Sequence, residues 1–318
     1  MSRAIEIVRG IGISMKIRMN ETTGEIMVGA ALALRGSSLL FSSIAMRTMG
    51  PFLLMGTRFL IAFVVIGLLF RDKLVSVTKK ELFHCALLGF GFFLSIFFEL
   101  KGLQTTPTTV TSFLEGAVVA IVPVLTCILA RKLPDKVTVL SVVFAMTGIG
   151  FLTLKGDHLG FSVGEMFIIL DALFYSITVL ITDWAAKNDD PMTVAIYQLL
   201  FIALFAFIGA FMFEDIRLPA SGTEWGAILA LALICSGVGF TLQPLGQKYI
   251  TPERAGLLAA ANPLSATTLG VIFLGEKITP SILAGAVLIL ISIFLPAWIK
   301  DRQTKKEIEQ VPKDPELE

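Results

Sequence analysis

Long apolar stretches, separated by short polar breaks, follow one another along almost the whole chain. Each has close to the roughly 20 apolar residues that a helix needs to cross a hydrocarbon core about 30 Å thick. The stretches cover residues 26–46, 51–70, 82–100, 107–130, 137–154, 164–185, 192–213, 225–246, 252–274 and 279–298. They are too long for membrane strands and lack the polar–apolar alternation of a barrel. The pattern therefore predicts an all-α membrane protein with ten transmembrane helices.

Basic residues are distributed unevenly over the breaks. Every second break and the two tails together hold most of the 26 Lys and Arg residues. The remaining breaks hold one basic residue each, namely Arg47, Lys101, Lys155, Arg217 and Lys277. Because loops rich in Lys and Arg stay in the cytoplasm, this bias predicts that both termini are cytoplasmic, an N-in/C-in orientation.

The ten stretches form two matching sets of five, over residues 25–155 and 163–298. An odd number of crossings per set makes the second set enter the membrane from the opposite side, which gives two inverted five-helix repeats. The fourth stretch of the first set opens with Thr106-Pro107, and that of the second set opens with Thr251-Pro252. Carriers built from inverted repeats hold their solute between the repeats near the midplane, so the repeat predicts a transporter.

The composition supports a chain that is nearly all membrane. Hydrophobic residues make up 55%, charged residues 16%, and the mean hydropathy is +0.82, well above a soluble domain. The basic residues form no patch, so no nucleic-acid partner is expected. Residues 1–24 lack the apolar core of a signal peptide and are predicted to be a cytoplasmic tail. Residues 299–318 are polar and are predicted to be a disordered cytoplasmic tail. The three cysteines lack metal-ligand spacing, and neither cofactor nor metal is expected.

Short motifs along both halves are similar to those of a known domain. The motifs are Gly36-Ser37-Ser38, Pro51-Phe52 and Arg58-Phe59 in the first half, and 251–258, Asn262-Pro263 and 274–279 in the second. Their order and spacing resemble two tandem EamA-type domains of the drug/metabolite transporter superfamily. The resemblance implies ten helices in inverted repeats, a central cavity and transport of small organic solutes, often outward. This chain departs from the family by carrying Arg35 and Glu115, so no substrate is inherited from the family.

Two charged residues fall near the middle of predicted helices, where inserting a charge costs about 2.5–3.5 kcal/mol. Arg35 shares a helix face with Ser38, and Glu115 shares one with Ser112. Arg35 either binds an anionic substrate group through its planar guanidinium or forms a structural ion pair with a buried acid. Glu115 is a candidate for proton coupling or amine binding, and the alternative is a permanent ion pair with Arg35.

Other polar residues in the apolar stretches are weaker candidates. Asp171 and Tyr175 share one face of the sixth stretch and are expected to line the central site. Gln243 and Asn262 each precede a proline, which interrupts helical hydrogen bonding, and transporters build sites at broken helices. The alternative is that both amides only join helices. Arg58 is interpreted as a structural charge.

These observations favour a secondary transporter that exports a small polar or amphipathic metabolite, such as an amino acid or related carboxylate, by alternating access around a central site between the repeats. Its expected partners are this substrate and the lipid bilayer of the cell (inner) membrane, and it works as a monomer or a homodimer. The alternative is a multidrug or lipophilic-cation exporter that depends on Glu115 and Asp171 and not on Arg35. No metal, nucleophile-elbow or nucleotide motif is present in the sequence, so no enzyme is expected.

Overall fold

The computed structural model describes residues 20–75, 77–131, 133, 136–153, 162–259, 261–275 and 277–309, and within these ranges every regular element is a helix. The helices of the first half are α2 (Glu21–Gly36), α3 (Ser38–Ala45), α4 (Pro51–Leu69), α5 (Arg71–Val75), α6 (Lys79–Leu103), α7 (Thr108–Glu115), α8 (Val118–Leu129) and α9 (Lys136–Thr153). Those of the second half are α10 (Val163–Asn188), α11 (Pro191–Phe213), α12 (Gly222–Ala230), the π-helix η1 (Leu231–Gly239), α13 (Phe240–Gln247), α14 (Pro252–Leu258), α15 (Ala261–Leu274) and α16 (Pro280–Glu309).

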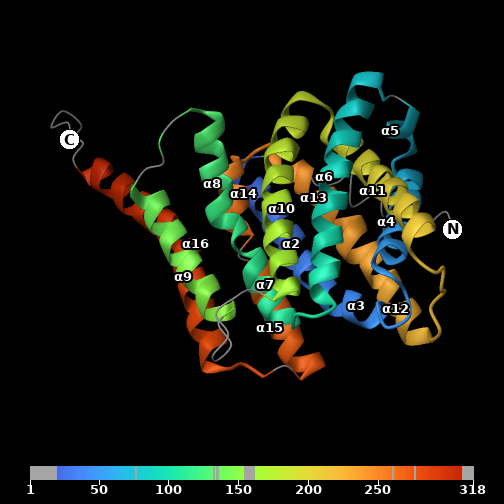
Figure 1. Ribbon diagram of the computed structural model, residues 1–318. Helices are drawn as coiled ribbons and strands as arrows, with labels where there is room; N and C mark the ends of the chain where they lie inside the picture. Colours follow the sequence, from blue (N-terminus) through green and yellow to red (C-terminus); the bar gives the residue numbers. More distant parts are fainter. Residues whose placement is uncertain are drawn as a thin grey trace.

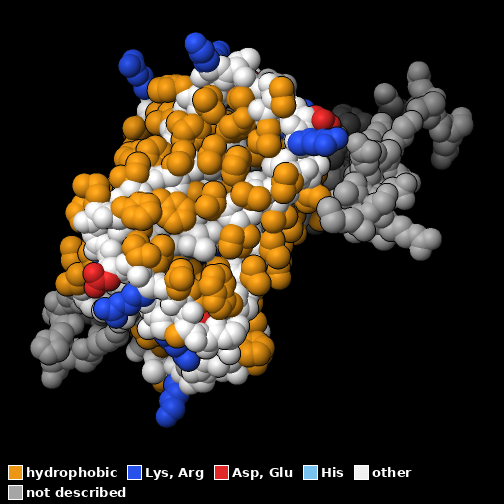
Figure 2. Space-filling model, turned by 90° about the vertical axis from the view of Figure 1, so that its right-hand side faces the viewer, with side chains coloured by type: hydrophobic (Ala, Val, Ile, Leu, Met, Phe, Trp, Pro, Cys, Tyr) orange, Lys and Arg blue, Asp and Glu red, His pale blue; other side chains and the backbone are white. Residues whose placement is uncertain are grey.

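Seven helical segments are long and apolar enough to cross a membrane. They are Glu21–Ala45, Pro51–Leu69, Lys79–Leu103, Thr108–Leu129, Val163–Asn188, Pro191–Phe213 and Gly222–Gln247. Three shorter apolar helices lie at Val139–Gly148, Ser265–Leu274 and Pro280–Ser292. Figure 2 shows one face of the molecule, where hydrophobic side chains cover the middle and Lys and Arg lie towards the two ends. The all-helical membrane fold is confirmed, and the count of ten crossings stays a prediction.

Capping side chains explain where several of these helices begin. Thr78 and Glu81 form a capping box at the start of α6, in which each side chain bonds the backbone N–H of the other residue. Ser162 and Glu165 form a second capping box at the start of α10. Asp190 accepts a hydrogen bond from the backbone N–H of Thr193 and precedes Pro191, the first residue of α11. Such caps satisfy N–H groups that the first helical turn leaves free.

Four of the apolar segments are interrupted in their interior. The first is interrupted at Ser37, between α2 and α3, and the fourth between Glu115 and Val118. The segment 222–247 contains the nine-residue π-helix η1, and the next segment is broken between Leu258 and Ala261. Three of these interruptions lie next to candidate polar residues. Arg35 and Ser38 lie on either side of the first, Glu115 precedes the second, and Asn262 follows the last. The interruptions therefore bring irregular backbone to the centre of the bundle.

Helices from the two halves of the chain pack closely against each other. α6 lies along α10, α4 along α11, and α2 against α13 and α15 (Figure 1). Glycines permit the closest approaches: a Cβ on Gly24 would lie 2.8 Å from the carbonyl oxygen of Gly246, and one on Gly36 would lie 2.5 Å from that of Asn262. α9 and α16 pack chiefly on each other and form one edge of the molecule (Figure 1).

The chain ends differ in part from the prediction. α16 continues to Glu309, so residues 301–309 are helical where the sequence predicted a disordered tail. The continuation fits the charged stretch after Ile299, since Lys, Glu and Gln are good helix formers. Residues 1–19 and 310–318, which contain most of both predicted tails, lie outside the described residues.

Candidate functional site

Two small enclosed cavities adjoin in the interior of the bundle. The first, called here the acidic chamber, is lined by Leu32, Arg35, Glu99, Glu115, Asp171, Tyr175, Ala259 and Asn262. The second, called the arginine chamber, is lined by Arg35, Ser38, Arg58, Ile96, Glu99, Cys235, Ser236 and Phe240. Arg35 and Glu99 belong to both linings. Each cavity has a volume of about 10 Å³, which is close to the minimum for one water molecule, so the site is closed in this conformation.

Three carboxylates converge on the acidic chamber. One oxygen each of Glu99, Glu115 and Asp171 lies within 4.8 Å of the others, and all three side chains are buried. The Ser95 hydroxyl donates to Asp171 at 2.6 Å, and the Asn262 amide donates to Glu115 at 2.7 Å. The second oxygen of Glu115 has no hydrogen-bond partner among the described residues. Like charges this close in a region of low dielectric repel strongly, so the chamber favours a cationic group.

Arg35 forms the wall between the chambers and is held by neutral groups. Its Nη1 donates to the side-chain oxygen of Gln243 at 3.3 Å. Its guanidinium lies over the rings of Tyr175 at 4.4 Å and Phe240 at 4.7 Å, contacts that stabilise a cation through the negative faces of the rings. Within the described part of the chain, no ion pair within 4.0 Å joins Arg35 to Glu115 or to another acid. The geometry therefore does not support the reading of Arg35 and Glu115 as a permanent pair.

Most of the candidate residues lie at these chambers. Arg35, Glu115, Asp171, Tyr175 and Asn262 line the acidic chamber, and Ser38 lines the arginine chamber. Gln243 is buried and contacts the site through Arg35 and through the Tyr175 hydroxyl, to which it donates at 3.4 Å. Ser112 is fully buried but donates to the carbonyl of Thr109 in its own helix, and it lines neither chamber. Arg58, interpreted from the sequence as structural, lines the arginine chamber.

Proline explains the position of a further buried amide. Pro244 has no N–H, so the carbonyl of Phe240 four residues earlier lacks its helical partner. The side chain of Gln198 donates to this carbonyl at 2.8 Å and is 1% exposed. Gln198 therefore joins α11 to α13 and lines neither chamber, as expected for an amide that only joins helices.

Glu99 is the site residue that sequence reasoning missed. It lies at the edge of its predicted stretch, two residues before Lys101, where an acidic residue is expected at the membrane surface. In the structure it is 5% exposed and lines both chambers. Phe92, Ser95 and Glu99 are spaced i, i+3 and i+7 and so share one helix face. That face contacts Arg35 through Phe92 and Asp171 through Ser95, and its spacing was the signal that could have identified Glu99.

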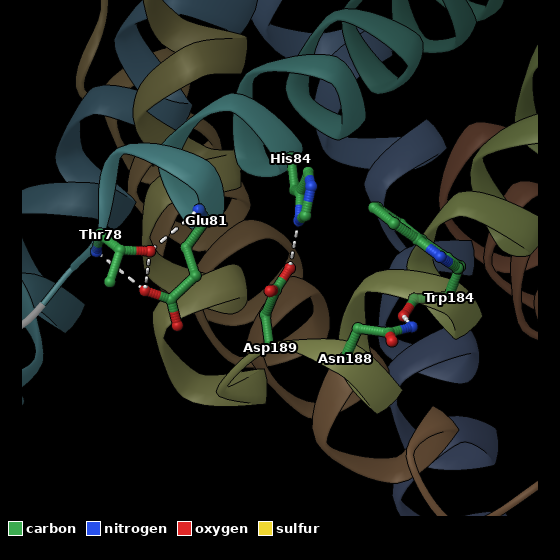
Figure 3. Close-up of polar contacts among 6 residues, drawn as sticks. All are labelled: Thr78, Glu81, His84, Trp184, Asn188 and Asp189. Carbon is green, nitrogen blue, oxygen red and sulfur yellow. Dashed lines mark hydrogen bonds and ion pairs between the residues drawn. The ribbon is translucent and has the colours of Figure 1, made fainter.

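A separate polar contact lies near the N-terminal end of α6, away from the chambers. His84 Nδ1 lies 2.7 Å from Asp189 Oδ2, and both side chains are nearly buried (Figure 3). The imidazole and the Trp184 ring meet edge to face, with centroids 4.4 Å apart and an angle of 65° between the ring planes. This pair joins α6 to the corner between α10 and α11. The other histidine, His158, lies outside the described residues.

The carboxylate trio is the group of described residues that could hold a metal ion. Its setting fits a dedicated metal poorly. Ca²⁺ takes six to eight oxygen ligands, whereas this chamber has room for about one water, and the Arg35 guanidinium lines the same space. We therefore assign no metal to it.

Comparisons with known proteins agree on the class of protein. The model of the EamA-like transporter family matches twice, over residues 22–154 and 162–297. The chain is 27% identical over 293 residues to the transporter YetK of Bacillus subtilis, covering 87% of both chains. It is 26% identical over 261 residues to a transporter of Archaeoglobus fulgidus, covering 82% of this chain and 81% of the relative.

A relative with a named substrate is also similar. The threonine/homoserine exporter RhtA of Escherichia coli K12 is 26% identical over 271 residues, covering 81% of this chain and 83% of the relative. A solved crystal structure superimposes with a TM-score of 0.69 at 20% identity, covering 89% of this chain and 99% of the solved chain. At this identity the superposition supports the fold alone. Together with the apolar helices, these matches describe a multi-pass transporter of the cell membrane.

Proposed function

Because the chain belongs to the EamA-like transporter family, we propose that it exports small zwitterionic metabolites, such as amino acids, by alternating access. The observation that carries this proposal is that Arg35 and three buried carboxylates line the same enclosed chamber. Arg35 binds the carboxylate of the substrate through its planar guanidinium. Glu115 and Asp171, with Glu99, bind its ammonium group. Similarity to an exporter of threonine and homoserine supports the same substrate class.

The proposed architecture is ten helices in two inverted repeats, with both termini in the cytoplasm. The two family matches support two repeats, one over 22–154 and one over 162–297. The helix breaks after Glu115 and before Ala261 fall at corresponding places of the two halves, and Asn262 bonds Glu115 across them. Rocking of one repeat against the other would expose the chambers to each side in turn.

Proton coupling forms a second part of the proposal, with Glu115 as the coupling carboxylate. Three carboxylates and the two guanidinium groups of Arg35 and Arg58 leave one net negative charge around the chambers. A proton on the carboxylate trio neutralises this charge when the substrate is absent. The ammonium of an arriving substrate displaces the proton, so that export and proton entry alternate on the same groups.

Transport of L-threonine in proteoliposomes tests the proposal. The wild-type protein should release preloaded threonine faster when protons can flow inward. Arg35→Gln should reduce this rate at least about tenfold, equivalent to ~1.4 kcal/mol of lost stabilisation. Glu115→Gln should abolish the response to the proton gradient. The exposed Arg47, changed to Gln, is the matched control for loss of a positive charge and should leave transport unchanged.

A different result selects the alternative function. If lipophilic cations are exported, and Arg35→Gln leaves their export intact while Glu115→Gln abolishes it, the protein is a multidrug exporter. If export continues in both Arg35→Gln and Glu115→Gln, the chambers bind neither a zwitterion nor a lipophilic cation, and both proposed functions are contradicted.

A further inference from the structure

The arginine chamber is not explained by a single contact between Arg35 and a substrate. It contains two guanidinium groups, those of Arg35 and Arg58, and one carboxylate, that of Glu99. The acidic chamber contains one guanidinium and three carboxylates. Thus the two adjoining cavities carry charges of opposite sign and share the wall formed by Arg35 and Glu99.

Arg58 is the most unusual group in this wall. It is 3% exposed, and its Nε has no hydrogen-bond partner. Within the described residues it lies over the face of the neighbouring Phe59 ring at 4.9 Å, and the charge of Glu99 attracts it without a direct ion pair. A guanidinium has five N–H donors in a fork that matches a carboxylate, and burying such a charge without an acceptor costs several kcal/mol. The unpaired Nε–H of Arg58 therefore points to a further acceptor inside the chamber, as an anionic ligand would supply.

The π-helix η1 supplies a second unpaired donor. Its residues Cys235 and Ser236 line the arginine chamber, and Ser236 is 1% exposed with no partner for its hydroxyl. π-Helical turns are rare and occur frequently at functional sites. The wider turn brings the serine hydroxyl to the chamber wall, opposite the arginines on α2 and α4.

We infer that the arginine chamber is the carboxylate subsite of the transporter, in which Arg35 and Arg58 bind the substrate carboxylate from two sides and Ser236 donates a third hydrogen bond. This inference rests on the proposed function and adds Arg58 and Ser236 as residues that determine specificity. The ammonium group of the same substrate lies across the shared wall, against the carboxylates of the acidic chamber. The opposite charges of the two cavities fix the orientation of a zwitterion and select against amines that lack a carboxylate.

Binding of three probes to the full-length protein in detergent, measured by isothermal titration calorimetry, tests the inference. L-Threonine carries both charged groups, L-threoninamide lacks the carboxylate, and acetate lacks the ammonium. Wild-type protein should bind threonine at least about tenfold more tightly than threoninamide, a difference of ~1.4 kcal/mol. Arg58→Gln should remove this difference by weakening threonine and acetate tenfold or more while leaving threoninamide unchanged.

Two further variants keep the test valid. Ser236→Ala removes an unpaired hydroxyl without breaking any contact, so it should fold normally and weaken only the two carboxylate probes, by about two- to fivefold. Arg47→Gln, which removes an exposed charge, should change none of the three affinities. If Arg58→Gln is unstable, the Ser236→Ala result decides.

The outcomes separate the subsite from the transport proposal. Equal weakening of threonine and threoninamide in Arg58→Gln and Ser236→Ala would mean a structural role and overturn the inference. So would unchanged binding of threonine and acetate, or a wild-type protein that binds no carboxylate probe. If acetate binds through Arg58 while threonine is neither bound nor transported, the anion subsite stands and the proposed substrate class is wrong.

Discussion

At the scale of single residues, Gly36 marks a close approach of α2 and α15 beside the site. A Cβ on Gly36 would lie 1.9 Å from Ser265 Oγ and 2.5 Å from the carbonyl oxygen of Asn262. The backbone carbonyl cannot move aside without displacing Asn262, whose amide bonds Glu115. We therefore expect Gly36→Ala to destabilise the protein by about 1–3 kcal/mol through overpacking, measured by thermal unfolding in detergent.

Gly29, on the same helix, provides the control. Among the described residues, a Cβ there would meet Leu258 alone, at an ordinary distance of 3.7 Å. Since alanine favours a helix over glycine by about 1 kcal/mol, Gly29→Ala should leave stability unchanged or raise it. Similar unfolding temperatures for the two variants would contradict the close approach of α2 and α15.

The residue scale also shows what sequence alone can and cannot predict about the site. Arg35, Glu115 and Asp171 were identifiable because a charge deep in an apolar stretch is costly. Glu99 was missed because it lies near the end of its stretch, where the same charge costs less, and only its spacing from Phe92 and Ser95 marked it. Arg58 was recognised as a charge within an apolar stretch, but its place in the arginine chamber was not predicted. No pattern in one helix shows which residues the other helices bring next to it.

At the scale of elements, the start of α4 depends on a carboxylate from a distant part of the chain. Glu214, at the end of α11, accepts hydrogen bonds from the backbone N–H groups of Phe52 and Leu53, both at 2.9 Å. These N–H groups have no helical partner, and a negative charge is favourable at a helix N-terminus. Glu214→Ala should therefore cost about 1–3 kcal/mol of stability.

The neighbouring acid is a matched control for this prediction. The Asp215 side chain is 88% exposed and has a 3.5 Å contact with Arg217, whose side chain is 72% exposed. Exposed pairs of this kind contribute little, so Asp215→Ala should change stability by less than about 0.5 kcal/mol. Equal effects of the two substitutions on thermal unfolding would show that Glu214 is not capping α4.

The Asp190 carboxylate that caps α11 should make the stability of the fold depend on pH. Partial burial alone would raise the pKa of Asp190, but hydrogen bonds from Thr193 and the nearby Lys73 ammonium lower it below the usual value. A carboxyl with a lowered pKa in the folded state stabilises the fold above its unfolded pKa of about 3.9. That stabilisation is lost as the pH falls through the folded value.

Asp190→Ala tests this cap. It should destabilise the protein by about 1 kcal/mol near pH 7, and the difference from wild type should shrink as unfolding is followed below pH 4. Asp190→Asn keeps a capping oxygen and should lose less stability at pH 7. A difference between wild type and Asp190→Ala that stays constant at low pH would be the wrong result for a charged cap.

Element boundaries were predictable to within a few residues except at the end of α16, which continues to Glu309, while the breaks inside elements were only partly predictable. Pro191 and the residues around Thr78 mark helix starts through their own chemistry. Pro263 signalled the break before Ala261, because proline removes a helical hydrogen bond. No proline lies within the break after Glu115 or within the π-helix at 231–239, so neither was predicted.

At the scale of the whole molecule, the closed chambers require a conformational change before any solute can enter. With about 10 Å³ in each chamber, the structure has no room for an amino acid at the proposed site. The proposed alternating access therefore predicts opening to each side in turn, on a timescale of microseconds to seconds. Cys235 reports this opening, because it lines the arginine chamber and is 1% exposed.

In a protein whose Cys85 and Cys127 are replaced by serine, Cys235 is the single thiol left. A membrane-impermeant methanethiosulfonate reagent should modify it from either side of the membrane, at least about tenfold more slowly than an exposed cysteine, since the reactive state is a minor population. Lys248→Cys and Arg217→Cys, both at exposed positions near opposite ends of the bundle, supply the reference rates, each in a protein whose three native cysteines are replaced by serine. Saturating L-threonine should change the rate at Cys235 and leave both references unchanged. Modification from one side only, or a rate as fast as the references, would mean that the chambers do not alternate between the two sides.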